Sequence, residues 1–227
     1  MLPPPPPAIL GVFLVFLRMR KLLLGLAFLL TMGWAHAGAY DEILDAAERS
    51  DSVAVIALLQ RGMDVNTADP AGNSLLMIAA RNGNVELLEF LLKNRAGVNR
   101  RNRFGDTAML VAAVKGNLDT MRLLQKHGGL LEPGGWSALH YAVFGQNAEL
   151  LDWIIAQKPS LDARAPNGQT ALMLAAKLGN LVFVKKLIDS DADMDLADYE
   201  GATAISLAKK AGHAEIAGYL RSVGAVE

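Results

Sequence analysis

The chain contains no cysteine among its 227 residues, and this absence excludes several classes of chemistry. Without thiols it can form no disulfide, no thiolate nucleophile, and no zinc or iron–sulfur site built on Cys ligands. A strong charge of one sign is also missing, since 22 Lys and Arg stand against 23 Asp and Glu, for a formal charge of −1. Proteins bind nucleic acid through cationic side chains that neutralise phosphates, so we expect no nucleic acid partner.

The sequence also lacks an apolar run long enough to cross a bilayer. Two shorter runs, residues 8–17 and 22–34, flank a basic cluster at residues 18–21. As a helix, the second run would extend about 20 Å, whereas the hydrocarbon core of a bilayer is about 30 Å thick. A single span made from both runs would bury the basic cluster near the bilayer centre, at about 2.5–3.5 kcal/mol for each charge. We therefore expect no stable membrane insertion of the processed chain.

The N-terminal region instead has the order of a secretory signal peptide. Basic Arg20 and Lys21 precede the apolar residues 22–34, and Ala35-His36-Ala37 has the small-x-small pattern of a cleavage site. We predict a signal peptide over residues 1–37, with cleavage after Ala37 or, in a second frame, after Ala39. The expected location of the mature protein is therefore the periplasm or, after secretion, the medium.

Residues 1–18 leave alternatives open. A complete signal peptide begins at Met19, and five consecutive prolines occupy residues 3–7 before it. Residues 1–18 are therefore either an untranslated extension from a mis-assigned start or a long n-region, and an uncleaved membrane anchor is a further alternative. Removal of residues 1–37 takes away three basic and no acidic residues, which leaves 19 against 23 and a charge of −4.

Beyond the signal, five segments of the chain share one pattern. They begin at Gly72, Gly105, Gly135, Gly168 and Gly201, with spacings of 33, 30, 33 and 33 residues. A fixed period of this size is typical of a solenoid, in which each repeat buries its apolar face against its neighbours.

Residues 137–142, Ser-Ala-Leu-His-Tyr-Ala, resemble the T-P-L-H-x-A motif of the ankyrin repeat, with Ser for Thr and Ala for Pro. The resemblance extends from Tyr40 to about Ala225. It implies an all-α solenoid of about six helix-turn-helix units with short β-hairpin loops, whose two outer units act as caps. The expected repeat units cover about residues 40–68, 69–101, 102–132, 133–164, 165–197 and 198–227.

The chemistry of individual positions predicts the same helices. Hydroxyl residues that can cap the first helix of a unit are Ser74, Thr107, Ser137, Thr170 and Thr203. Glycines that suit the left-handed residue at the end of that helix are Gly83, Gly116, Gly179 and Gly212. The second helix has apolar residues at i, i+3 and i+4, as in Val55/Leu58/Leu59, Leu88/Leu91/Leu92, Leu151/Ile154/Ile155 and Val184/Leu187/Ile188. This spacing predicts one buried stripe on each second helix.

The junction of the third and fourth units departs from the pattern in two ways. Three residues are missing there, so we expect a shorter and looser hairpin at residues 128–135. Gln146 takes the place of the helix-ending glycine, and the adjacent Gly145 leaves open a shift of the turn by one residue.

Residues that suggest chemistry have structural explanations. His127, His140 and His213 lie where the resemblance implies capping and hydrogen bonds between repeats. The acidic cluster at residues 189–198 lacks the glycine and the terminal glutamate of an EF-hand, so we expect a solvated loop. The sequence contains no G-x-S-x-G elbow and no Gly-rich phosphate loop. We predict no enzymatic activity, no metal and no cofactor, with a hydrolase or metal-dependent enzyme as the alternative.

The resemblance implies that the two residues before each helix-ending glycine line the concave face of the stack. We call these residues the concave row: Arg81 and Asn82, Val114 and Lys115, Phe144 and Gly145, Lys177 and Leu178, and Lys210 and Ala211. The hairpin tips are expected to add Phe104, Trp136 and Tyr199. Aromatic and basic side chains of this kind are enriched at protein-binding hot spots.

We therefore predict a monomeric scaffold that binds a protein partner through its concave face and hairpin tips. The predicted contact residues are Phe144, Trp136, Val114, Lys115, Lys177, Leu178, Arg81, Phe104 and Tyr199. For Phe144 and Trp136 the alternative is packing that covers the shortened junction. A secreted effector that binds a host protein is the alternative function.

Overall fold

The computed structural model describes residues 38–132 and 134–226, and the predicted signal peptide lies outside them. The chain divides into two compact parts, Met1–Asp45 and Ala46–Glu227. Residues 38–48 are helical. In the described ranges, no helix is long and apolar enough to cross a membrane.

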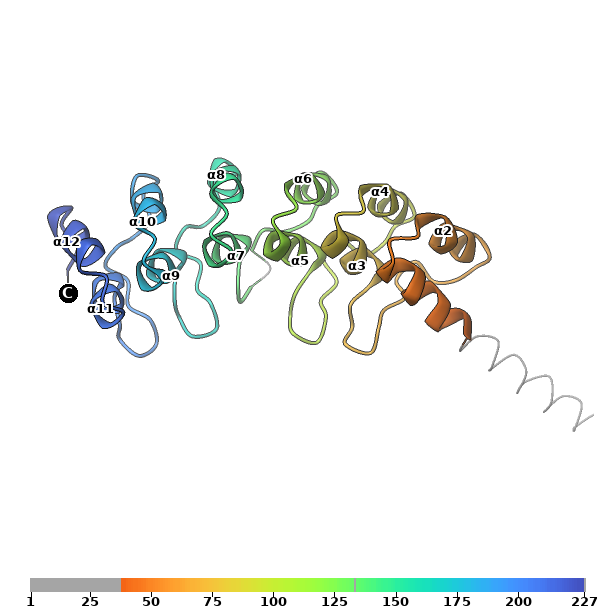
Figure 1. The fold of residues 1–227 in the computed structure, drawn as a ribbon, viewed down its shortest axis with the longest axis horizontal. Helices are drawn as coiled ribbons and strands as arrows, with labels where there is room; N and C mark the ends of the chain where they lie inside the picture. The colour runs from red at the N-terminus through yellow and green to blue at the C-terminus, as the bar shows by residue number, and fades with distance from the viewer. Residues whose placement is uncertain (1–37, 133, 227) are drawn as a thin grey trace, which may run out of the picture. The chain divides into compact units, whose positions relative to one another are not determined.

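The second part is built from pairs of short helices in two layers (Figure 1). The first helix of each pair, which we call the inner helix, is α3 (Leu75–Asn82), α5 (Ala108–Lys115), α7 (Ala138–Phe144), α9 (Ala171–Leu178) or α11 (Ala204–Lys210). The outer helices are α2 (Ser52–Gln60), α4 (Val85–Lys93), α6 (Leu118–Lys126), α8 (Ala148–Ala156), α10 (Leu181–Ile188) and α12 (Ala214–Ser222). Each inner helix packs on the next inner helix and on its own outer helix, which confirms the all-α repeat solenoid.

The predicted capping hydroxyls begin all five inner helices. Ser74 Oγ accepts from the Met77 N–H at 3.3 Å, and Thr107 Oγ1 accepts from the Leu110 N–H at 3.4 Å. The same bond is made by Ser137, Thr170 and Thr203. Antiparallel bridges join Ala68 to Ser74 and Ala197 to Thr203, so a hairpin leads into α3 and another into α11.

Each inner helix is followed by a left-handed residue, whether or not that residue is glycine. Gly83, Gly116 and Gly179 end α3, α5 and α9 in the left-handed conformation, as predicted. Gly212 is also left-handed, with φ 83°, and it follows the right-handed Ala211 at the end of α11. At the end of α7, Gly145 is right-handed with φ −76°, and Gln146 itself takes φ 51°. The turn does not shift to Gly145, because the left-handed residue keeps its place in the repeat.

The apolar stripes of the outer helices form the core against the inner layer. Val55, Leu88, Leu151 and Val184 each have 0% exposure, and the residues three positions later in each stripe are also buried. At the fourth position Leu92 is buried, whereas Leu59, Ile155 and Ile188 are half-buried. Small residues at the end of the inner helices, such as Ala79 and Ala80, are also fully buried, which lets neighbouring helices approach closely. The core is therefore continuous from one helix pair to the next within Ala46–Glu227.

Candidate protein-binding face

The concave row lies in the last turns of the inner helices. Arg81 is in α3, Val114 and Lys115 end α5, Phe144 ends α7, and Lys177 and Leu178 end α9. The apolar members are open to solvent, with exposures of 48% for Val114, 59% for Phe144 and 36% for Leu178. The repeat therefore presents one exposed apolar side chain on each of three consecutive inner helices.

Phe144 and Trp136 come together at the centre of this row. Their rings meet edge to face, with centroids 6.0 Å apart and an interplanar angle of 84°. Trp136 also lies 5.2 Å from the Tyr141 ring and 5.6 Å from the His140 ring, and it is half-buried. Trp136 thus packs over the start of α7 next to the shortened hairpin, whereas Phe144 keeps most of its ring exposed.

Tyr141 ties this aromatic cluster to the preceding repeat. Its hydroxyl donates to Asp106 Oδ1 at 2.8 Å, across 35 residues of sequence. Burial is the largest effect that raises the pKa of the Tyr141 phenol, and the hydrogen bond to the Asp106 carboxylate raises it further. This pair could not be predicted from the sequence, because its partners meet only when α7 packs beside the hairpin that leads into α5.

His140 has the structural role predicted for it. Its Nδ1 lies 2.8 Å from Ser137 Oγ and accepts from the Ser137 N–H at 3.2 Å. Its Nε2 lies 3.0 Å from the Gln169 carbonyl of the next repeat. These partners fit a neutral ring with the proton on Nε2, and burial lowers the pKa of the imidazole.

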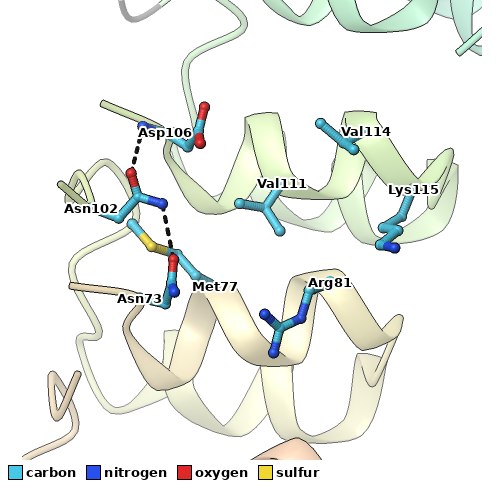
Figure 2. A pocket seen from close by; sticks show the side chains of 8 residues that line it. All are labelled: Asn73, Met77, Arg81, Asn102, Asp106, Val111, Val114 and Lys115. Atoms are coloured by element: carbon cyan, nitrogen blue, oxygen red, sulfur yellow. Dashed lines mark hydrogen bonds between the residues drawn. The ribbon is translucent and has the colours of Figure 1, made fainter. Parts of the chain in front are cut away.

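A hollow of about 190 Å³ lies between α3 and α5 beside the row (Figure 2). Met77, Val111 and Val114 supply its apolar lining. Figure 2 shows Arg81 and Lys115 at one end of the hollow and Asn73, Asn102 and Asp106 at the other. The sequence did not indicate that Met77, Val111 and Asp106 line a hollow, because the hollow forms only between adjacent repeats.

The hairpin tips expose the other two predicted aromatic residues. Phe104 is 79% exposed and Tyr199 is 70% exposed. Within the described chain, no ring contact joins either of them to the cluster around Trp136. The Tyr199 tip is held in place, because its N–H donates to the Asn167 carbonyl at 3.3 Å and its ring lies directly over Gly168.

Asp198 fixes the same loop. Burial acts to raise the pKa of its carboxyl, but N–H donors from Ala202, Gln169 and Glu200, together with nearby Lys177, outweigh burial and lower it. Asp198 Oδ1 accepts from the Ala202 N–H at 2.8 Å and from the Glu200 N–H at 3.0 Å.

Carboxylates of the acidic loop at residues 189–198 accept hydrogen bonds from backbone N–H groups. Asp193 Oδ1 accepts from the Asp195 N–H at 2.9 Å, and Asp195 Oδ1 accepts from the Val226 N–H at 2.7 Å. Across residues 38–132 and 134–226, no group of His, Asp and Glu has the arrangement of a metal site.

The comparisons with known proteins identify the class. A family model described as ankyrin repeats (3 copies) matches residues 43–102, 76–165 and 139–226. These matches cover most of the chain, so the protein belongs to the ankyrin-repeat family.

Two solved structures are similar over the whole repeat region. One is a chain in the complex of a predatory endopeptidase from Bdellovibrio bacteriovorus with an immunity protein, at 30% identity and TM-score 0.70, covering 80% of this chain and 97% of that chain. The other is an ankyrin repeat domain from Acinetobacter baumannii AYE, at 28% identity and TM-score 0.70, covering 81% and 98%.

The curated relatives are much longer proteins. The potassium channel AKT1 of Arabidopsis thaliana is 43% identical over 178 residues, which are 78% of this chain and 21% of the channel. The NF-kappa-B p105 subunit of Gallus gallus matches 74% of this chain at 30% identity, and the match is 14% of that protein. What these relatives share with the chain is the repeat region, which is a protein–protein interaction module.

Proposed function

We propose that this chain is a periplasmic scaffold that binds one partner protein through the concave row. The observation that carries the proposal is the set of exposed apolar side chains, Val114, Phe144 and Leu178, on consecutive inner helices. Cations in the same last turns, such as Lys115 and Lys177, surround them. An apolar centre with a charged rim is the usual arrangement of a protein interface.

The location rests on the sequence. The basic residues, apolar run and small-x-small pattern before Gly38 support export, and the absence of cysteine is compatible with an oxidising compartment. In the proposed function, the exported scaffold binds its partner in the periplasm. In the alternative, the chain is secreted and its partner is a host protein.

The test is capture of the partner from the native periplasm by crosslinking mass spectrometry, followed by titration of the purified pair. We expect Phe144→Ala to weaken binding at least about 30-fold, because a central hot spot contributes about 2 kcal/mol or more. Val182→Ala is the control, since Val182 has the same 59% exposure on the outer helix α10. Equal affinities of both variants would contradict the site.

Trp136→Ala separates binding from packing. We expect it also to weaken binding, but part of its effect passes through the packing of Trp136 on Tyr141. Thermal unfolding of the same variant measures that part. If the loss of affinity for Trp136→Ala disappears at a temperature where the variant is fully folded, Trp136 is a packing residue only.

A narrower candidate partner is an exported endopeptidase. It is supported by the similarity, at 30% identity over almost the whole of that chain, to a chain in the endopeptidase–immunity protein complex. We expect a cognate endopeptidase to lose activity when this chain is added in stoichiometric amount, and to keep it with Phe144→Ala. If the endopeptidase binds this chain but keeps its activity, the chain is a scaffold and not an inhibitor. If this chain alone hydrolyses the substrate, the enzyme alternative is favoured.

A further inference from the structure

Charge is distributed unevenly between the two helix layers. The inner helices α3, α5, α7, α9 and α11 contain the cations Arg81, Lys115, Lys177, Lys209 and Lys210 and no Asp or Glu. The outer helices α2, α4, α6, α8, α10 and α12 contain six acidic and six basic residues. The cations of the inner layer therefore stand out in a chain that has more acidic than basic residues overall.

The polar groups at one end of the hollow between α3 and α5 are already occupied. Asn73 Oδ1 accepts from Asn102 Nδ2 at 2.9 Å, and Asn102 Oδ1 accepts from the Asp106 N–H at 2.9 Å. Asp106 Oδ1 accepts the Tyr141 hydroxyl. These bonds join neighbouring hairpins, so this end of the hollow serves the fold.

The opposite end keeps free donors. Arg81 pairs with Glu48 through Nη2, which orients the guanidinium and leaves its Nε and Nη1 hydrogens available. Among the described residues, the Lys115 ammonium has no ion-pair partner, and it is exposed at the end of α5. Between the two cations lies the apolar lining of Met77, Val111 and Val114 (Figure 2).

We infer that this hollow is a subsite for an acidic, apolar segment of the partner protein. An aliphatic side chain of that segment lies on Val111 and Val114, and a neighbouring carboxylate pairs with Lys115 and with the free edge of Arg81. The inference rests on the proposed function, and it adds the chemistry of the occupant. An aliphatic side chain fits a hollow of about 190 Å³. A carboxylate supplies the counter-charge that Lys115 lacks and accepts from the Arg81 donors that Glu48 leaves available.

The test uses short random peptides displayed on phage and selected on the full-length protein. We expect selected peptides to have Asp or Glu next to Leu, Ile or Val. Their affinity should fall as salt is raised, because exposed charge pairs are screened. Lys115→Glu should weaken the best selected peptide by about three- to tenfold at low salt.

Lys126→Glu is the matched control. Lys126 is also exposed and also the last residue of its helix, α6, so both variants change the net charge and the helix dipole in the same way. We expect the affinity of the selected peptide to be unchanged by Lys126→Glu. Circular dichroism of both variants checks that each remains folded.

Two other outcomes have separate meanings. Selected peptides that are neutral or basic, bind independently of Lys115 and still need Phe144 would overturn the acidic subsite and keep the concave-row scaffold. Peptides that bind independently of both Lys115 and Phe144 would overturn both proposals. Equal weakening by Lys115→Glu and Lys126→Glu would also overturn the subsite, since the effect would then follow from net charge alone.

Discussion

At the scale of single residues, Gln146 has a backbone conformation that glycine has in four other repeats, at Gly83, Gly116, Gly179 and Gly212. Its φ of 51° places a Cβ in the left-handed region, which costs about 1–2 kcal/mol for an L-residue other than glycine. Glycine at the same place also loses about 0.4–1 kcal/mol through the greater freedom of the unfolded chain. We expect Gln146→Gly to stabilise the protein by about 0.5–1 kcal/mol in chemical denaturation.

Gln146→Ala is the control for this change, because it removes the exposed side chain and keeps the Cβ. It should leave the free energy of unfolding unchanged or lower it. If Gln146→Ala stabilises the protein as much as glycine does, the gain comes from the side chain and not from the backbone.

His140 gives the stability a pH dependence of known sign. Burial lowers its pKa in the folded protein, while in the unfolded chain it takes up a proton near its ordinary value of 6.5. The unfolded state therefore binds more protons below that value, and stability falls as the pH falls through it. We expect a lower free energy of unfolding at about pH 5 than at about pH 7.5.

His140→Gln separates this contribution from those of the carboxyl groups. The variant loses stability at both pH values, because the bond to Ser137 is disturbed, but the difference between the two pH values should shrink. Unfolding curves in urea at both pH values measure this difference. An unchanged pH difference would assign the effect to other groups.

At the scale of helices and hairpins, the bond from Tyr141 to Asp106 links α7 to the hairpin before α5. The hairpin between these two repeats is three residues shorter than the others. The Tyr141 side chain of α7 connects the two repeats through its bond to Asp106. Tyr141→Phe keeps the ring contact with Trp136 and removes the donor to a carboxylate. We expect a loss of about 1–2 kcal/mol in the free energy of unfolding.

Tyr199→Phe is the comparison for that loss. Tyr199 lies at an exposed hairpin tip, so removal of its hydroxyl should leave the free energy of unfolding unchanged. Equal effects of the two substitutions would mean that the Asp106 bond contributes nothing to the junction.

The same scale shows what can be predicted from sequence and what cannot. Ser74 and Gly83 mark the ends of α3 because their backbone preferences act over three or four residues. Leu88 and Leu91 mark the buried side of α4 because the period of a helix is local too. The hollow and the Tyr141–Asp106 bond could not be predicted, because they depend on how separate repeats pack, and the conformation of Gln146 was open because glycine stood beside it.

At the scale of the whole chain, the proposed function depends on exposed residues that the repeat framework holds at the surface. Capping, core and loop roles occupy Ser137, His140 and Asp198, the residue types that catalysis would need. Val114 and Lys115 are exposed, and Phe144 is 59% exposed although its ring contacts Trp136. This arrangement supports the proposed binding surface, and the proposed compartment limits which partners the protein can meet.

The proposed compartment depends on the N-terminal residues, and it gives the last prediction. Intact-mass analysis of the protein from the periplasm or medium should find an N-terminus at Gly38 or Tyr40, because Ala35 and Ala37, or Ala37 and Ala39, supply the small residues that the signal peptidase needs. Cleavage after Ala37 keeps every described residue in the mature chain, whereas cleavage after Ala39 removes two residues of the helix at 38–48. Ala37→Leu should therefore block the first frame and the second together, and the unprocessed chain should accumulate with membranes. A wild-type chain that keeps residues 22–34 and fractionates with membranes would support the anchor alternative and contradict a free periplasmic scaffold.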